Sequence, residues 1–262
     1  MIDIHAHILP GIDDGPKDID ESIEMLHQAQ KDGIHTIVAT PHTLNGIYTC
    51  TPEMVSRGIH HLCDEMKKHD ISVSIYPGME IHICDDFHAR LEDNQIIPIN
   101  NSRYVLIELP APLIPPHFKD LVFQLRLKGF YPILAHPERN FAVQKHPDMI
   151  YDFIEWGVFI QITAVSVTGF FGGRIKKLCK KFIQNRLVHF LASDAHSSVN
   201  RLPILSEAHF QCEKILNDKQ EARALIEHNP KNVIENKPIE VSEPIRKKRW
   251  FCSFKNIQRF YH

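Results

Sequence analysis

Apolar residues follow two alternating patterns along the chain: short continuous runs, and longer stretches with the spacing of a helix. A short apolar run bounded by turn residues is typical of a strand that is buried on both faces of a parallel sheet. Such strands are predicted at residues 2–4, 36–39, 71–75, 104–109, 131–135, 158–162 and 187–192. Because helical patterns separate these runs, the sequence predicts an α/β fold with seven parallel strands.

The stretches between the strands carry helix start and stop signals. Asp18 and Glu21 begin one helix that Gly33 ends, and Thr51 with Pro52 begins another. Further helices are predicted around residues 118–128, 147–156, 175–183, 203–217 and 218–229. Seven strand–helix units suit a (β/α) barrel better than an open doubly wound sheet, and no G-x-G-x-x-G follows the first strand. We expect a barrel domain over residues 1–239 and a tail over 240–262.

Composition narrows the class of protein. The chain has 262 residues and a net charge of -2, which gives no sign of general nucleic-acid binding. It has no apolar run of about 18 residues and no basic segment followed by an apolar one near residue 1, so neither a membrane span nor a secretory signal is expected. The six cysteines are scattered without a C-x-x-C pair. This is typical of reduced thiols and favours a cytoplasmic location.

Side chains that can bind metal ions cluster where the predicted strands end. His5 and His7 are one residue apart on the first strand, so both imidazoles face the same side. The others are Asp13 and Asp14 in the next loop, then His42, Glu80, Glu108 and His136 at successive strand ends, and Asp194 with His196 after the last strand. Only the strand at 158–162 has no obvious ligand at its end. Because these ends share one face of a parallel barrel, we expect one cavity to hold the set.

Each candidate also has a simpler explanation. Asp13 and Asp14 could form only a turn before Gly15, and His42 and His136 could be core histidines. Glu108 is harder to explain away, since a carboxylate in a buried strand costs several kcal/mol without a partner. Together the set favours a site for zinc, manganese or iron. Five histidines and four carboxylates (Asp14, Glu80, Glu108 and Asp194) exceed the needs of one ion, so two or three ions are expected.

Two arginines lie a few residues beyond candidate ligands. Arg139 follows His136, and Arg201 follows His196. A guanidinium group pairs bidentately with phosphate oxygens, although a surface salt bridge would explain either residue alone. A metal cluster with two arginines is suited to hydrolysing a phosphate ester.

Five segments resemble the polymerase and histidinol phosphatase (PHP) superfamily. They are residues 3–15, 39–42, 77–80, 135–139 and 193–196, which contain all the candidate ligands except Glu108. More closely, they resemble the superfamily's bacterial manganese-dependent protein-tyrosine phosphatases of capsule and exopolysaccharide gene clusters. The resemblance covers roughly residues 1–235. It implies a distorted seven-stranded TIM-like barrel with three divalent metal ions, with manganese as the expected metal and iron or zinc as alternatives.

The resemblance also implies how the ligands are shared. His5, His7, Glu80 and Asp194 would hold the first ion; Glu80 would bridge to a second ion, held also by Glu108 and His136; Asp14, His42 and His196 would hold the third. Arg139 and Arg201 match the phosphate-binding arginines of the family. Many relatives carry Cys at the position of Ala6 and His at that of Thr43, and neither position is a ligand.

The implied activity is hydrolysis of phosphotyrosine on a protein. A metal-activated hydroxide would attack phosphorus directly, with no phosphoenzyme. The expected substrate is the tyrosine-rich tail of a membrane-associated bacterial tyrosine kinase, and the expected role is regulation of capsule or exopolysaccharide synthesis. Two alternatives are a small-molecule phosphatase of the same superfamily, acting for instance on histidinol phosphate, and a non-catalytic, metal-stabilised binding module.

One further motif points to a different mechanism. Cys84 and Arg90 have the spacing of the cysteine-dependent tyrosine phosphatases. The residues between them include Asp85 and Asp86, which would repel phosphate and raise the pKa of the thiol. We therefore predict that Cys84 is not the nucleophile.

The end of the chain is basic and aromatic. From Pro244 onward it has no acidic residue, while Arg246, Lys247, Lys248, Arg249, Lys255 and Arg259 interleave with Trp250, Phe251, Phe254, Phe260 and Tyr261. Such a tail can contact an anionic membrane surface. A solvated end, or an end packed on the barrel, is the alternative.

Overall fold

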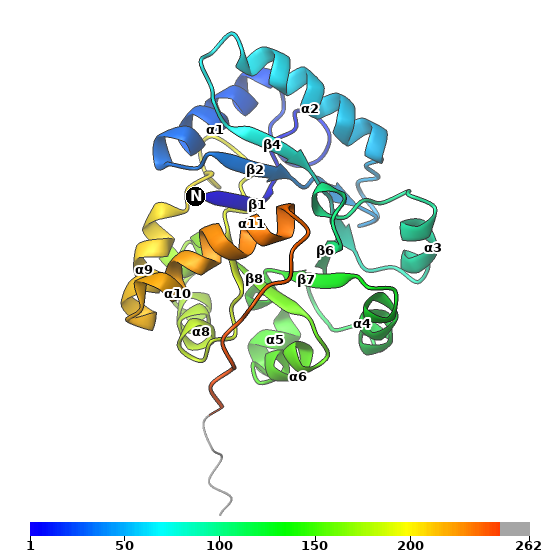
Figure 1. Cartoon of the computed structure of the whole chain (residues 1–262), viewed down its shortest axis with the longest axis vertical. Coiled ribbons are helices and arrows are strands. Elements are labelled where there is room, and N and C mark those ends of the chain that lie inside the picture. Colours follow the sequence, from blue (N-terminus) through cyan, green and yellow to red (C-terminus); the bar gives the residue numbers. More distant parts are fainter. Residues whose placement is uncertain (247–262) are drawn as a thin grey trace, which may run out of the picture.

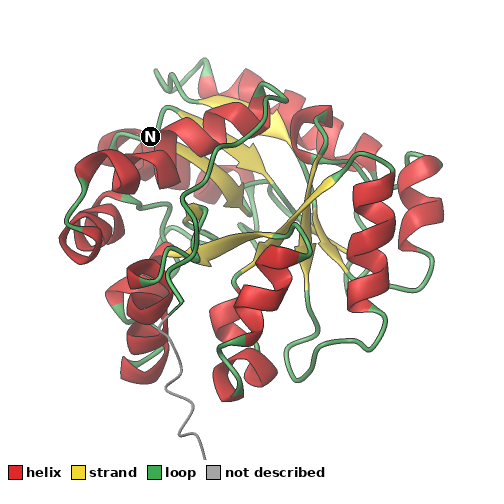
Figure 2. Ribbon diagram, turned by 60° about the horizontal axis from the view of Figure 1, so that its bottom comes forward, coloured by secondary structure: helices red, strands yellow, loops and turns green. Residues whose placement is uncertain are grey.

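The computed structural model describes residues 1–246, and within them nine strands form two parallel sheets (Figures 1 and 2). The first sheet has the order β1 (Ile2–Ala6), β2 (Thr36–Ala39) and β4 (Ser74–Pro77). The second has the order β3 (His42–Thr43), β5 (Glu80–His82), β6 (Tyr104–Glu108), β7 (Tyr131–Ala135), β8 (Phe159–Thr163) and β9 (Phe190–Ala192). The predicted α/β fold with parallel strands is confirmed.

The number of strands differs from the seven that were expected. The two additional strands, β3 and β5, lie where β2 and β4 resume after short breaks. Pro41 has no N–H for the ladder, although its carbonyl accepts from the Glu80 N–H at 3.2 Å. At Gly78, a Cβ atom would lie 2.9 Å from Val38, so the chain passes too close for a side chain. These breaks split two strands in the described range, and closure into one barrel stays a prediction.

Two strands, β4 and β9, begin three residues later than predicted, because their expected first residues hydrogen-bond to the end of the preceding helix. The N–H of Ile71 bonds back to the carbonyl of Met66, and that of Leu187 to the carbonyl of Phe182. Residues 71–73 and 187–189 therefore lie outside the strands. The apolar pattern does not show whether such residues belong to the turn that ends a helix or to the start of the next strand.

Helices cover the outside of the sheets (Figure 2). The predicted ones are α1 (Ile19–Asp32), α2 (Pro52–Met66), α4 (Phe118–Leu127), α6 (Met149–Glu155), α8 (Gly173–Gln184), α9 (Ser206–Leu216) and α10 (Lys219–Arg223). Asp18 caps α1 by accepting from the N–H of Glu21, and Gly33 ends it with a φ of 90°. The helices that were not predicted are α3 (Phe87–Glu92), α5 (Phe141–Lys145), α7 (Ala164–Thr168) and α11 (Asn229–Ile234). The helices α3, α5 and α7 are too short to show a helical period, whereas α11 continues α10 through the π-helical turn at Ala224–His228, beyond the predicted end of that helix.

Both sheets contribute to an inner apolar cluster. Ile4 and Val38 from the first sheet pack with Leu106, Ile133 and Phe190 from the second. A larger cluster fills the space between the strands and the surrounding helices. Polar residues replace apolar ones at the carboxyl ends of the strands, which leaves that edge for the candidate site.

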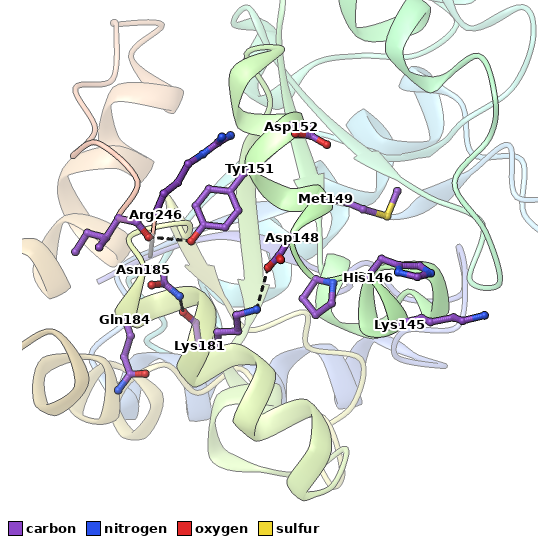
Figure 3. Close-up of a pocket in the computed structure, with 12 residues that line it drawn as sticks. Lys145, His146, Asp148, Met149, Tyr151, Asp152, Lys181, Gln184, Asn185 and Arg246 are labelled. Atoms are coloured by element: carbon purple, nitrogen blue, oxygen red, sulfur yellow. Dashed lines mark hydrogen bonds and ion pairs between the residues drawn. The ribbon is translucent and has the colours of Figure 1, made fainter. Parts of the chain in front are cut away.

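The chain after α11 returns to pack on two helices. The N–H of Ile245 donates to the carbonyl of Asn185 after α8, and the hydroxyl of Tyr151 on α6 donates to the carbonyl of Ile245 (Figure 3). Arg246 pairs with Glu155 and lies over the Tyr151 ring. The beginning of the predicted tail is therefore packed on the domain, while residues 247–262 lie outside the described residues. No helix within residues 1–246 has the length and apolar character needed to span a membrane.

One core histidine, directly before β9, accepts a hydrogen bond from β8 and is sensitive to pH. His189 is 3% exposed, and its Nδ1 accepts a hydrogen bond from the N–H of Ile160 on β8 at 2.8 Å. Burial lowers the pKa of His189 to about 4. A neutral imidazole is needed because a proton on Nδ1 would remove this acceptor.

We expect His189 to make the fold less stable in mild acid. Its pKa in the unfolded chain is about 6.5, so the folded state binds fewer protons than the unfolded state. Its stabilising effect is complete above that pH and is lost as the pH falls towards 4. Between pH 7.5 and pH 5 the loss is about 2 kcal/mol. Urea unfolding in chelator should show a weaker pH dependence for His189→Gln, whose amide oxygen can still accept from Ile160. An identical dependence in both proteins would contradict the assignment.

Candidate metal centre

All nine predicted ligands meet at the carboxyl edge of the two sheets. Their ligand atoms form three overlapping groups, each within 4.8 Å. The groups are His5, Glu80, His136 and Asp194; His7, Asp14, His42 and His196; and His42, Glu80 and Glu108. Residues from opposite ends of the sequence thus form one site, because parallel strands present their carboxyl ends on one side.

Glu80 lies at the centre of this site and is fully buried. Its Oε2 is 3.3 Å from Nε2 of both His5 and His7 and 2.9 Å from Nδ1 of His42, while its Oε1 is 2.7 Å from Nε2 of His136. Burial raises the pKa of Glu80, but the positive charges of His5, His136 and His42 hold it well below its usual range. An ionised carboxylate with imidazoles around both oxygens is suited to bridging two cations.

Asp194, after β9, connects the imidazoles to both predicted arginines. Its Oδ1 lies 3.4 Å from Nε2 of His5 and 3.6 Å from Nε2 of His7, while its Oδ2 pairs with the guanidinium groups of Arg139 and Arg201. Burial raises the pKa of Asp194, but the charges of Arg139, His5 and Arg201 hold it well below its usual range. This carboxylate therefore fixes both guanidinium groups at the edge of the candidate metal site.

The remaining ligands lie on the open side of the site. Oδ1 of Asp14 is 3.5 Å from Nε2 of His196 and 3.6 Å from Nε2 of His42. Glu108 approaches Nδ1 of His42 at 3.7 Å and Nε2 of His136 at 3.9 Å. The side chain of Asp14 is 46% exposed and that of Glu108 18%, so a ligand can enter from this side.

Two supporting residues hold the imidazoles and were not assigned this role from the sequence. Oδ2 of Asp13 is 2.6 Å from Nδ1 of His7 and also accepts from the N–H of His42 at 2.9 Å. Oε1 of Gln161 on β8 is 3.0 Å from Nδ1 of His5. Both contacts leave Nε2 free for a metal ion. The sequence did contain a signal for Gln161: it is a polar residue within a predicted buried strand, as Glu108 is.

Two candidate ligands have a left-handed backbone. His136 has a φ of 31° and Asp194 a φ of 51°. This conformation costs on the order of 1 kcal/mol or more in a residue with a side chain. Both residues follow directly after a buried strand, β7 and β9. Such strain is typical of positions that are held for function.

Protons balance the charge of the site in a chain without metal ions. Burial lowers the pKa of His7, but the carboxylates of Asp13 and Glu80 raise it to about 10. Burial and the charge of His7 lower the pKa of His196 to about 4. Divalent cations can replace these protons, and the nitrogen and carboxylate oxygen donors suit manganese, iron or zinc.

The alternative cysteine motif does not form a phosphate cradle. Burial and Asp86 raise the pKa of Cys84 to about 11, so its thiol is a poor nucleophile at neutral pH. Arg90 pairs with Asp86 at 2.8 Å. The arginine is thus already neutralised by a carboxylate.

Known proteins resemble this chain over nearly its full length. It is 40% identical over 254 residues to a putative tyrosine-protein phosphatase CapC of Staphylococcus aureus, covering 96% of this chain and 99% of the relative. It is 36% identical over 256 residues to the tyrosine-protein phosphatase YwqE of Bacillus subtilis (strain 168), covering 97% and 100%.

A solved structure agrees with these relatives. It comes from work on YwqE of Bacillus subtilis and CpsB of Streptococcus pneumoniae, described there as metal-dependent tyrosine phosphatases. It matches with a TM-score of 0.90 and 37% identity, covering 95% of this chain and 100% of the other. A family model for capsular polysaccharide synthesis proteins matches residues 1–235, so the resemblance read from the motifs is confirmed. The chain therefore belongs to the CpsB/CapC family of capsular polysaccharide synthesis proteins.

Proposed function

We propose that this protein is a metal-dependent phosphatase that hydrolyses phosphotyrosine on a protein. The observation that carries the proposal is Asp194, which faces two imidazoles with one oxygen and holds Arg139 and Arg201 with the other. This arrangement supports a metal cluster with two phosphate-binding guanidinium groups beside it. The relatives in the family are named as tyrosine-protein phosphatases, which supports phosphotyrosine as the substrate.

We infer three divalent ions, with Mn²⁺ as the proposed metal. His5, His7, Glu80 and Asp194 would hold the first, Glu80, Glu108 and His136 the second, and Asp14, His42 and His196 the third. The distances around Glu80 support a bridging carboxylate, since its two oxygens face different imidazoles. Bound divalent ions supply a water that ionises near neutral pH and reduce the charge on phosphate.

The protein's own groups bind and orient the phosphoryl group. Arg139 and Arg201 each keep N–H donors beyond those used by Asp194, and these can pair with phosphate oxygens. Since Asp194 already fixes both side chains, little conformational entropy is lost when substrate binds. The tyrosyl oxygen has a pKa near 10, so it leaves without a strong general acid. The nine imidazoles and carboxylates would be occupied by metal ions and so would not be free to act as nucleophiles, which favours hydrolysis without a phosphoenzyme.

The proposed substrate protein is a membrane-associated bacterial tyrosine kinase, as the family resemblance implies, with a role in capsule or exopolysaccharide synthesis. We also propose that the basic and aromatic residues after Arg246 contact an anionic membrane and keep the enzyme near this substrate.

We further infer that the two sheets form one distorted barrel. Two hydrogen bonds of 2.8 Å support it: the N–H of His7 donates to the carbonyl of Ala195, and that of Asp194 to the carbonyl of His5. They join the first strand to the segment that follows the last.

The chain should lose its activity on a phosphotyrosine peptide after chelation and regain it with Mn²⁺. Glu80→Gln should abolish turnover, because one neutral amide cannot bridge two cations.

Cys84→Ser should turn over like the parent, and histidinol phosphate should be a much poorer substrate than the phosphotyrosine peptide. Phosphate release measured on matched substrates checks all four results. Activity that survives chelation but is lost in Cys84→Ser would contradict the metal-dependent mechanism and indicate a cysteine nucleophile instead.

Asp13→Asn should weaken binding of Mn²⁺ by roughly 10- to 100-fold. The neutral amide of Asn stabilises the proton on Nδ1 of His7 less well than the carboxylate of Asp13 does. Calorimetric titration measures the affinity, and excess Mn²⁺ should restore most of the turnover. Asp20→Asn, in the exposed first turn of α1, is the control. Equal affinities for the parent and Asp13→Asn would show that this contact does not support the metal site.

Deleting residues 247–262 should remove binding to vesicles that contain anionic lipid and leave binding to neutral vesicles unchanged. The cut keeps Ile245 and Arg246 in their packed positions. Co-sedimentation at low and high salt measures the effect. If the shortened chain bound anionic vesicles as well as the parent does, the proposed membrane contact would be wrong. The proposed phosphatase activity would not be affected.

A further inference from the structure

Large apolar side chains are exposed on the loops around the candidate site. They are Ile47 (79% exposed), Leu113 (48%), Phe141 (63%), Phe170 (55%) and Val199 (75%), which we call the apolar rim. Each lies on a loop or short helix that follows the carboxyl end of a strand: β3, β6, β7, β8 and β9 in that order. The rim therefore shares its face of the molecule with the candidate ligands.

Direct contacts tie the rim to residues of the site. Tyr48, next to Ile47, stacks on the ring of His42 with centroids 6.3 Å apart and planes 6° apart. The ring of Phe170 packs against Phe171 at 5.1 Å, and the guanidinium group of Arg139 lies over Phe171 at 5.2 Å. These aromatic rings therefore extend from the phosphate-binding group to the surface.

Hydrogen bonds also join neighbouring rim loops to one another. The N–H of Phe141 donates to the carbonyl of Ala111 at 2.9 Å, and the side chain of Asn140 donates to the carbonyl of Leu113 at 3.1 Å. Because the two loops are bonded together, Leu113 and Phe141 form one continuous part of the surface. Val199 lies two residues before Arg201, which Asp194 holds at the site.

The rim loops carry no charged residue. Residues 43–52, 109–116, 140–144, 163–173 and 197–200 contain no Asp, Glu, Lys or Arg, although these types make up 24% of the chain. The five rim loops are therefore neutral, while the loop after β5 on the same face carries Asp85 and Asp86. A substrate residue that lies over the rim meets apolar side chains and neutral backbone.

We propose that the apolar rim binds the polypeptide on either side of the phosphotyrosine and selects aliphatic and aromatic neighbours over charged ones. The inference rests on the proposed phosphatase function. With the phosphoryl group at Arg139 and Arg201, the residues before and after the tyrosine must cross these loops, since an extended chain advances only about 3.3 Å per residue. Apolar neighbours gain by leaving water there. Charged neighbours lose hydration and gain no ionic partner.

Two phosphotyrosine peptides of equal length and net charge test the proposal. One carries Leu, Phe or Tyr at the positions next to the phosphotyrosine, and the other carries Glu and Lys in equal numbers at those positions. With the Mn²⁺-loaded full chain, kcat/KM should be roughly tenfold higher for the apolar peptide. The difference should persist at high salt, because no ion pair contributes to it.

Substitutions locate the effect on the rim. Ile47→Ser and Phe170→Ser should each reduce the ratio of the two kcat/KM values by roughly three- to fivefold. Phe123→Ser is the matched control, because Phe123 is 58% exposed on α4, away from the rim loops. It should keep the parental ratio. Circular dichroism of each variant confirms that it is folded.

The results separate this inference from the proposed function. The proposal that the rim selects apolar neighbours would be wrong if the two peptides had equal kcat/KM values, or if the rim variants and Phe123→Ser had equal ratios. Neither result would contradict the proposed phosphatase activity. No hydrolysis of either peptide would instead overturn the proposed function. If the rim variants lowered self-association in sedimentation experiments and left the peptide ratio unchanged, the rim would be an interface between copies and the proposal would be wrong.

Discussion

Ionised carboxylates buried in one cavity are the constraint on which the rest of this structure depends. Glu80 and Asp194 are almost completely removed from water, and each would cost several kcal/mol without compensating positive charge. Imidazoles surround Glu80, and two guanidinium groups hold one oxygen of Asp194. The strands bring these groups together, and a left-handed backbone at Asp194 is tolerated where it serves that arrangement.

The same balance explains why the site favours metal ions. Protons on imidazoles such as His7 neutralise the carboxylates when no ion is bound. Divalent cations can contact both nitrogen and oxygen donors at once, so they can replace the protons on the imidazoles. Asp13 and Gln161 hold two imidazoles from behind, which limits the rearrangement that binding requires.

The sequence predicted the elements that have strong local signals. The strand at 131–135 and the helix between Asp18 and Gly33 match the structure, because a buried apolar run and a pair of caps are local features. The nine candidate ligands could be named from the sequence because they are ionisable residues at strand ends, and their side chains lie close together in the structure. Gln161 was missed because an amide is rarely a metal-site residue. The breaks at Pro41 and Gly78 were missed because they depend on close packing between strands, which no local pattern records.

Chemistry and selectivity occupy different parts of one face. The charged centre suits any phosphate ester, whereas the neutral loops around it can distinguish one polypeptide from another. The charged centre itself rests on the claim that nine distant residues hold divalent ions together. Anomalous diffraction at the manganese edge from crystals grown with Mn²⁺ tests that claim most directly. The account predicts peaks among these nine side chains, with Glu80 between two of them; peaks located elsewhere, or a cavity that holds no manganese at saturating concentration, would contradict it.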